Sequence, residues 1–201
     1  MNKFISLSAS SQKALQIANM SIKLPVNILI LGQAGIGKKL LVKEILPDNK
    51  IYDAKLLEND IFNKKIDLTQ FSIIVITNIE KVSNRKMFFE KLKDIKIVAT
   101  AFLEYKDSEN IFSVRIDIEP LERREEDLKE LIRLYTDEAK KIYNPNVVSK
   151  KIKIDISGNG TTLKQSIYKS ILLESITKND IVDILYNFFI YELRDNRKTY
   201  K

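Results

Sequence analysis

The chain has 201 residues, which is enough for one well-buried domain with a small appendage. Its composition is 44% hydrophobic and 30% charged with 5 glycines and 4 prolines, which excludes a fibrous or disordered protein and is typical of a helix-rich globular one. Cysteine and histidine are both absent, so disulfides, zinc centres, thiol nucleophiles and imidazole acid–base chemistry are excluded. Any bound metal ion would need oxygen ligands.

The net charge of +7 is compatible with a nucleic acid or an acidic protein as partner. The lysines are spread along the chain, however, which favours a generally basic solvated surface. No apolar run approaches the roughly 18–20 residues that span a bilayer, and the N-terminus has no long apolar stretch behind a basic start, unlike a signal peptide. We therefore expect a cytoplasmic protein without a membrane partner.

The first elements in chain order are a helix, a strand and a second helix. Apolar residues at helical spacing behind several serines predict a helix over 8–23, which Pro25 ends. The apolar run 26–31 is rich in β-branched side chains and is typical of a buried parallel strand. A loop over 32–37 and a helix over 38–46 follow.

Further strands then alternate with short helices. We predict strands over 50–54, 71–77, 96–100 and 114–118, and helices over 56–62 and 83–94. Strands separated by helices imply a parallel sheet with helices on both faces, so the predicted fold class is α/β.

From residue 125 onward the pattern is helical. The predicted helices cover 125–143, 161–175 and 178–196. Pro145, which is flanked by asparagines, marks a turn and places a domain boundary beside it. We predict an α/β core over 1–144 and a small helical lid over 145–201. The last helix has an apolar stripe that would pack on the lid or serve as a partner surface.

The loop after the first strand contains two framing glycines, Gly32 and Gly37, followed directly by Lys38. In this pattern backbone N–H groups surround a phosphate, the following helix adds partial positive charge, and the lysine neutralises β- and γ-phosphate oxygens. The predicted nucleotide-binding residues are Gly32, Gln33, Ala34, Gly35, Ile36, Gly37, Lys38 and Lys39. Most such loops have a Ser or Thr hydroxyl for Mg²⁺ at the position of Lys39, so one metal ligand is missing.

Three more short motifs follow the loop in order. They are Leu56–Phe62, Pro120–Leu128 and the stretch from Ser157 to Leu163. With the loop, they resemble the AAA+ domain of the bacterial sigma-54-dependent transcription activators, the enhancer-binding proteins or Fis-family regulators. The corresponding family motifs are Leu-Leu-Glu-Ser-Glu-Leu-Phe-Gly, Pro-Leu-Arg-Glu-Arg-Arg-Glu-Asp-Ile and Pro-Gly-Asn-Val-Arg-Glu-Leu. This resemblance covers about residues 5–174 and implies a P-loop AAA+ core with a parallel sheet flanked by helices and a small C-terminal helical lid.

The chain departs from that family in the parts that contact partners. The family's long surface loop with Gly-Ala-Phe-Thr-Gly-Ala, which touches the sigma factor, is replaced by the short stretch 63–70. The helix-turn-helix for enhancer DNA should follow the lid, but 177–201 offers one aromatic-rich helix and a short basic tail. The resemblance therefore implies neither a sigma-contacting loop nor a helix-turn-helix.

The chain also departs from the family in its catalytic groups. Where the family's strand ends Leu-Asp-Glu, the Asp for Mg²⁺ and the Glu for the attacking water, this chain has Ile76, Thr77 and Asn78. The remaining differences are Ala101 for the γ-phosphate-sensing Asn, no arginine over 104–114, and Thr161 for the lid arginine.

Hydrolysis needs a positioned Mg²⁺, an oriented water and a cation for transition-state charge. The resemblance implies that all three are missing, so we expect no catalytic residues, no dedicated metal site, and a pseudo-ATPase with very slow or no turnover. The loop can still hold a diphosphate, so weak ATP or ADP binding is expected, with Mg²⁺ only alongside the nucleotide. A working ATPase with displaced groups, Glu80 and Lys164, is the alternative.

The leading functional hypothesis is a degenerate activator-like AAA+ protein that regulates transcription through a protein partner. A sigma-54 activator or another transcription component is the candidate partner. A DNA-associated AAA+ protein of the replication or clamp-loader type is the alternative, motivated by the basic charge and the tail 194–201. Such DNA binding would not use a helix-turn-helix.

Overall fold

The structure is a computed structural model that describes residues 3–106, 108–143, 152–175 and 186. The chain divides into two compact units, which we call the core unit (Met1–Leu131 with Asp155–Leu163) and the lid unit (Ile132–Ile154 with Lys164–Lys201). The predicted boundary at 144/145 and the predicted helix over 178–196 lie outside the described residues, apart from residue 186. Among the helices that are described, none combines the length and the apolar character that a membrane crossing would require.

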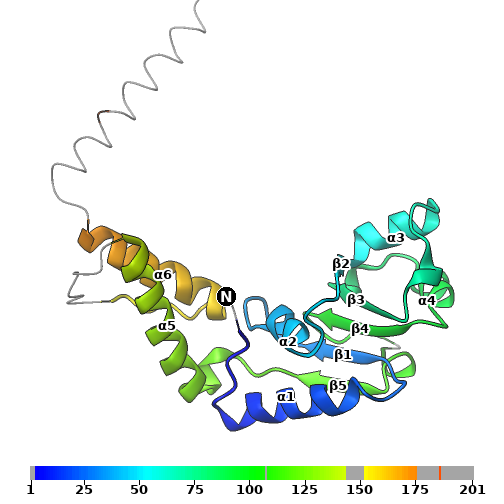
Figure 1. Ribbon diagram of the computed structural model, residues 1–201, viewed down its shortest axis with the longest axis horizontal. Helices are drawn as coiled ribbons and strands as arrows, with labels where there is room; N and C mark the ends of the chain where they lie inside the picture. Colours follow the sequence, from blue (N-terminus) through cyan, green and yellow to red (C-terminus); the bar gives the residue numbers. More distant parts are fainter. Residues whose placement is uncertain (1–2, 107, 144–151, 176–185, 187–201) are drawn as a thin grey trace, which may run out of the picture. The chain divides into compact units, whose positions relative to one another are not determined.

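A parallel sheet forms the centre of the core unit. Within the described residues it has five strands in the order β2-β3-β4-β1-β5 (Figure 1). The strands are β1 Ile28–Leu31, β2 Ile51–Asp53, β3 Ile73–Thr77, β4 Lys96–Ala101 and β5 Val114–Asp117. The register aligns Ile30 on β1 with Thr100 on β4 and Thr77 on β3, so the carboxyl ends of these strands share one edge of the sheet.

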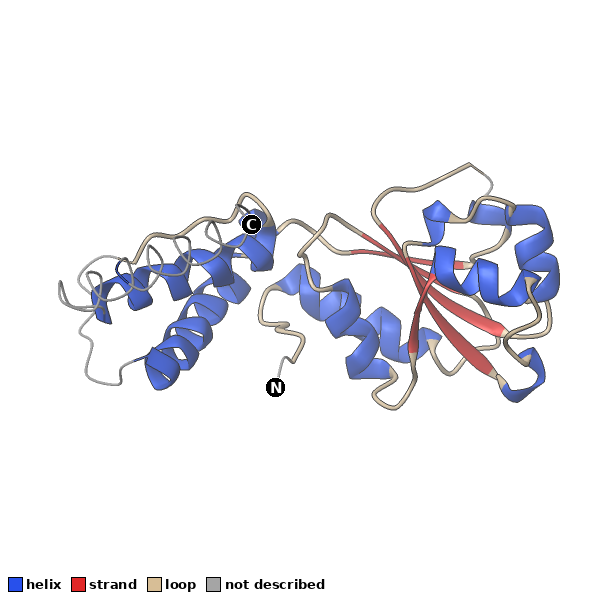
Figure 2. Cartoon of the chain, turned by 90° about the horizontal axis from the view of Figure 1, so that it is seen from above, coloured by secondary structure: helices blue, strands red, loops and turns tan. Residues whose placement is uncertain are grey.

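Helices cover both faces of this sheet (Figure 2). The helices of the core are α1 Ala9–Ser21, α2 Lys38–Ile45, α3 Ala54–Phe62 and α4 Arg85–Lys91. Because side chains alternate across a strand, Ile28 and Ile30 pack with α1 and α2, whereas Leu29 and Leu31 pack with α3 and α4. Burial on both faces explains why the central strands β1, β3 and β4 are mainly apolar runs, whereas the edge strand β5 exposes Arg115 and Asp117. The predicted α/β class is confirmed.

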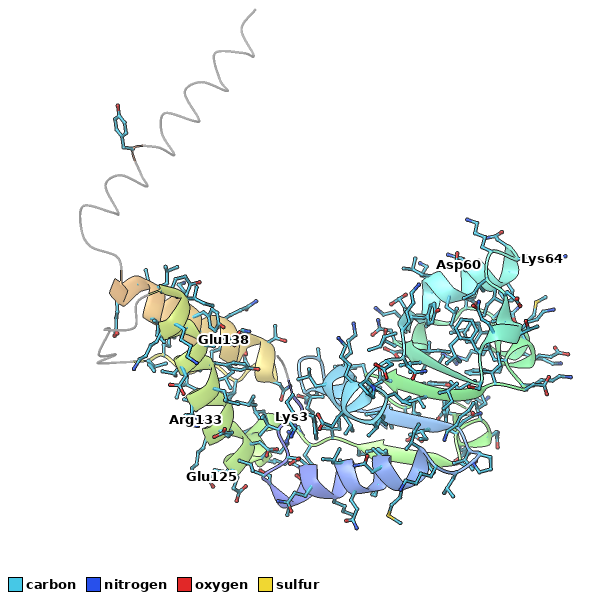
Figure 3. All side chains as sticks on the ribbon, in the orientation of Figure 1. Lys3, Asp60, Lys64, Glu125, Arg133 and Glu138 are labelled. Carbon is cyan, nitrogen blue, oxygen red and sulfur yellow. The ribbon has the colours of Figure 1, made fainter. Side chains whose placement is uncertain are left out.

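Two longer helices run from the core unit into the lid unit. They are α5 Glu125–Tyr143, which has the predicted bounds, and α6 Asn159–Ser175, which begins before the predicted Thr161. Inside the lid unit Lys164 on α6 forms a 3.2 Å ion pair with Glu138 on α5, which is labelled in Figure 3. The Lys164 ammonium also lies 5.4 Å and 5.0 Å from the ring centroids of Tyr135 and Tyr168.

A candidate phosphate-binding loop

The loop between β1 and α2 has a backbone conformation that requires glycine. Gly35 and Gly37 have φ angles of 72° and 108°, a region that side chains with a Cβ rarely adopt. A Cβ at Gly35 would also lie 2.3 Å from the carbonyl oxygen of Gly158 and 2.8 Å from Oγ1 of Thr161. The loop therefore packs directly on the start of α6 within the core unit.

Each carbonyl oxygen from Gly32 to Gly37 accepts a hydrogen bond. The Lys38 ammonium donates to the first two, those of Gly32 and Gln33. The donors to the others are Asn159 Nδ2 to Ala34 (3.1 Å), Gly160 N to Gly35 (3.0 Å), Arg124 Nη1 to Ile36 (3.1 Å), and the N–H groups of Leu40 and Leu41 to Gly37 (2.9 and 3.0 Å). The orientation of the loop is therefore fixed along its whole length.

In contrast to the carbonyl groups, the backbone N–H groups of the loop are not hydrogen-bonded to the rest of the protein that the structure describes. Within the described part of the chain, none of the N–H groups of residues 33–39 donates a hydrogen bond to another residue. These donors lie at the start of α2, where the helix dipole adds partial positive charge. Carbonyl groups that are bonded to the protein, together with N–H groups that remain available, form the arrangement that binds a phosphate anion.

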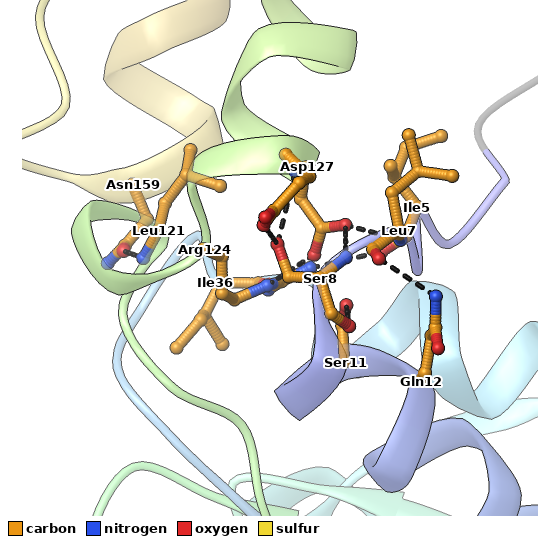
Figure 4. A network of polar contacts seen from close by, with 11 residues as sticks. Ile5, Leu7, Ser8, Ser11, Gln12, Ile36, Leu121, Arg124, Asp127 and Asn159 are labelled. Carbon is orange, nitrogen blue, oxygen red and sulfur yellow. Dashed lines mark hydrogen bonds and ion pairs between the residues drawn. The ribbon is translucent and has the colours of Figure 1, made fainter.

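A buried ion pair joins the loop to residues 5–8 and to the start of α5 (Figure 4). Arg124 Nε donates to Asp127 Oδ2 at 2.7 Å, and the two side chains are 3% and 0% exposed. Arg124 Nη2 donates to the carbonyl oxygen of Ile5 at 3.1 Å, and Asp127 accepts from the N–H groups of Leu7 and Ser8. Every charged group of the pair is hydrogen-bonded, which is what makes such burial tolerable.

The pKa of Asp127 reflects this environment. Burial by itself would raise the pKa of the carboxyl, but hydrogen bonds from Ser11, Ser8, Arg124 and Leu7 bring it below its ordinary value. Asp127 therefore stays ionised and holds the guanidinium that bonds the loop.

The neighbouring strand ends are used for structural contacts. Asn78 has a left-handed backbone (φ 58°), and its Nδ2 donates to Asp53 Oδ2 at 2.9 Å, which holds the pKa of Asp53 below its ordinary value. Thr77 Oγ1 donates to the carbonyl oxygen of Tyr52 at 3.2 Å. Ala101, which ends β4, is buried and carries no polar group. None of Thr77, Asn78 and Ala101 carries a carboxylate, and the polar groups of Thr77 and Asn78 are engaged with Tyr52 and Asp53.

The structure locates both displaced groups of the alternative hypothesis. Glu80 lies in the 3-10 turn Ile79–Lys81 after β3. Burial lowers the pKa of Lys38, and the charge of Glu80 acts in the opposite direction. Lys164 is engaged with Glu138 in the lid unit. Among the described residues, no group of three or more acidic side chains is placed to hold a metal ion.

The predicted residues Gly32 to Lys39 all lie in this loop or at the start of α2. Their contact with a nucleotide stays a prediction. Ile36 is buried, so only its backbone is available to a ligand, whereas Lys39 is exposed. In the sequence, Arg124, Asp127 and Asn159 stand out only as parts of motifs, and their contacts with the loop were not predicted. The sequence signal for them was that these polar residues lie at or near the starts of the helices predicted over 125–143 and 161–175.

Comparisons with known proteins identify the fold. No family model matches the chain, and no curated protein matches it. A crystal structure of NtrX from Brucella abortus in complex with ATP superimposes with a TM-score of 0.67 at 13% identity, covering 86% of this chain and 53% of that one. The complex of the same protein with ADP gives 0.62 at 12% identity, covering 85% and 51%. AMPPCP-bound DnaA from Aquifex aeolicus gives 0.54 at 14% identity, covering 98% and 73%.

These likenesses show that the chain has the α/β fold of AAA+ P-loop proteins. The chain spans about half the length of the NtrX chains that it matches.

Proposed function

We propose that the chain binds the phosphates of ADP or ATP at Gly32–Lys39 and hydrolyses ATP very slowly or not at all. One observation carries this proposal. The carbonyls of the loop are all hydrogen-bonded to the protein, while the N–H groups of residues 33–39 are not used by other described residues. That arrangement suits the binding of a phosphate anion.

The N–H groups would hold a diphosphate, and Lys38 would leave its bonds to Gly32 and Gln33 to neutralise it. The residues present do not fit a catalytic Mg²⁺ in the same way. Lys39 replaces the hydroxyl ligand, and Thr77 and Asn78 are engaged with Tyr52 and Asp53. Nucleotide binding is therefore proposed without a catalytic cycle.

The binding test is calorimetry with ADP and with ATP. We expect weak binding to the wild type and loss of heat for Lys38→Ala. The matched control is Lys43→Ala, a charge removal at an exposed position of the same helix. No heat at millimolar nucleotide would refute the proposal.

The turnover test is phosphate release from ATP. We expect none above the background of the Lys38→Ala variant. Turnover at the rate of a working AAA+ ATPase, abolished by Lys38→Ala, would refute this proposal and favour the ATPase with rearranged catalytic groups.

At the level of the cell we propose a cytoplasmic regulator of transcription that acts through a protein partner, a sigma-54 activator or another transcription component. Its support is the motif resemblance combined with the short stretch 63–70 in place of the sigma-contacting loop. Affinity purification from the native cell with mass spectrometry should recover a transcription component. Recovery of none, together with salt-sensitive DNA binding, would favour the DNA-associated alternative.

A further inference from the structure

An irregular segment, residues 4–8, lies against the phosphate loop just before α1, and we call it the strap. Phe4 anchors the strap, since its side chain is only 3% exposed and belongs to the same buried cluster as Ile36 of the loop. A Cβ built on Gly37 would lie 3.4 Å from Cε2 of Phe4, so the ring packs on the Gly37 backbone. The strap is therefore packed on the loop, although the nucleotide-binding residues predicted from the sequence do not include it.

A single guanidinium joins the strap to the loop (Figure 4). Arg124 Nη2 donates to the carbonyl oxygen of Ile5, and Arg124 Nη1 donates to that of Ile36, both at 3.1 Å. The Cζ atom of Arg124 also lies 5.4 Å from the ring centroid of Phe4, a distance at which a cation–π interaction forms. Because the Arg124 side chain is 3% exposed, water does not compete for these contacts.

The shared guanidinium determines which way one peptide group of the loop faces. The peptide bond between Ile36 and Gly37 is trans, so its C=O and N–H groups point in opposite directions. With the Ile36 carbonyl held by Arg124, the Gly37 N–H is turned away from Arg124 and remains available to a phosphate. Glycine has few steric barriers to backbone rotation, so the local chain does not fix this peptide group by itself. Its orientation depends on Arg124, which the strap holds in turn.

We propose that the strap sets the affinity of the loop for the phosphates of a nucleotide. Phe4 and Ile5 hold the Arg124 guanidinium in place, and Arg124 keeps the Gly37 N–H directed at the phosphate. Phe4 and Ile5 are positioning residues and do not contact the ligand. This inference deepens the nucleotide binding proposed above and rests on it. Because coupling between two sites is reciprocal, a phosphate bound at the loop also stabilises the docked strap.

The first experiment is calorimetry with ADP on the full chain. Phe4→Leu removes the ring from Gly37 and from the Arg124 guanidinium, so we expect a Kd about fivefold above that of the wild type. The matched control is Phe88→Leu, the same substitution at a fully buried ring of α4 on the opposite face of the sheet. It should keep the Kd within about twofold of the wild-type value.

Urea denaturation of the two variants separates positioning from stability. Each variant loses part of a buried ring, so both should be less stable than the wild type by similar amounts. An equal rise of the Kd in both variants would show that affinity follows general stability and would overturn the proposal. A wild-type Kd in a folded Phe4→Leu variant would overturn it as well. Absence of heat with the wild type would overturn nucleotide binding itself, and this inference with it.

Hydrogen exchange on the wild type tests the same coupling without a substitution, so it is decisive if Phe4→Leu does not fold. The N–H groups of Leu7 and Ser8 donate to a buried carboxylate, and saturating ADP should slow their exchange about threefold or more. The matched control is the N–H groups of Ser83 and Asn84, which donate to the buried Glu58 carboxylate. Their exchange should not change. Equal slowing of both pairs, or no slowing at Leu7 and Ser8, would overturn the proposal.

Discussion

The carboxyl ends of β1 and β3 lie at the same edge of one sheet, but the residues that follow them form different contacts. After β1, the backbone is held at each carbonyl and presents its N–H groups. After β3, the side chains of Thr77 and Asn78 are bonded to Tyr52 and Asp53. A backbone site depends on the packing of its surroundings, whereas a catalytic site depends on the identity of single side chains. The phosphate loop is held by many contacts, whereas any catalytic role at the end of β3 would depend on the identity of Thr77 and Asn78.

The largest expected effect comes from the ion pair behind the loop. Arg124→Met leaves Asp127 buried without its cation and removes the bond to Ile36, so we expect a loss of about 3–5 kcal/mol in the free energy of unfolding. Urea denaturation measures it. Arg123→Met, the adjacent exposed arginine, should change stability by less than about 0.5 kcal/mol. Equal effects of the two variants would show that the ion pair does not organise the loop.

The next effect tests the close approach at Gly35. Gly35→Ala combines an unfavourable φ with a Cβ placed 2.3 Å from the carbonyl oxygen of Gly158, so we expect a loss of about 2–4 kcal/mol and no nucleotide binding. Gly37→Ala shares the strained φ, but its Cβ makes only a 3.4 Å contact with Phe4, so about 1–2 kcal/mol is expected. Urea denaturation separates the two. A larger loss at Gly37 would contradict the packing described here.

A smaller effect is expected after β3. Asn78→Gly keeps the left-handed backbone and removes the hydrogen bond to Asp53, so stability should fall by about 1 kcal/mol. Calorimetry should give the wild-type affinity for ADP, because Asn78 contributes no donor to the phosphate loop. Loss of ADP binding in this variant would contradict the claim that the residues after β3 do not contribute to the phosphate loop.

The smallest effect is a dependence on pH. The pKa of Asp127 is lower in the folded chain than its ordinary value of 3.8, so unfolding takes up a proton at acid pH. The stabilisation is complete above about pH 5 and is lost as the pH falls below the ordinary value towards the folded one. Urea denaturation at about pH 6 and about pH 3.5 should show a smaller loss for Asp127→Asn than for the wild type. The same loss in both chains would show that the ion pair is not the acid-sensitive contact.

The sequence pattern was sufficient to predict the strands and helices of the core, because the central strands β1, β3 and β4 are apolar runs, the edge strand β5 alternates, and each helix is buried on one face. The loop could be predicted because Gly32, Gly37 and Lys38 occur at a fixed spacing between a strand and a helix. The partners of the loop could not, because Arg124 lies 88 positions and Asn159 about 125 positions along the chain from the carbonyls that they bond. No local pattern records contacts over such separations.

The sequence by itself determined the α/β class, the order of the elements and the position of the phosphate loop, since these follow from local periodicity and from glycine geometry. The tertiary structure decided which donors hold the loop carbonyls, and it decided that Thr77 and Asn78 bond to Tyr52 and Asp53. Those features depend on strand order and register, which bring residues of distant segments to one edge of the sheet.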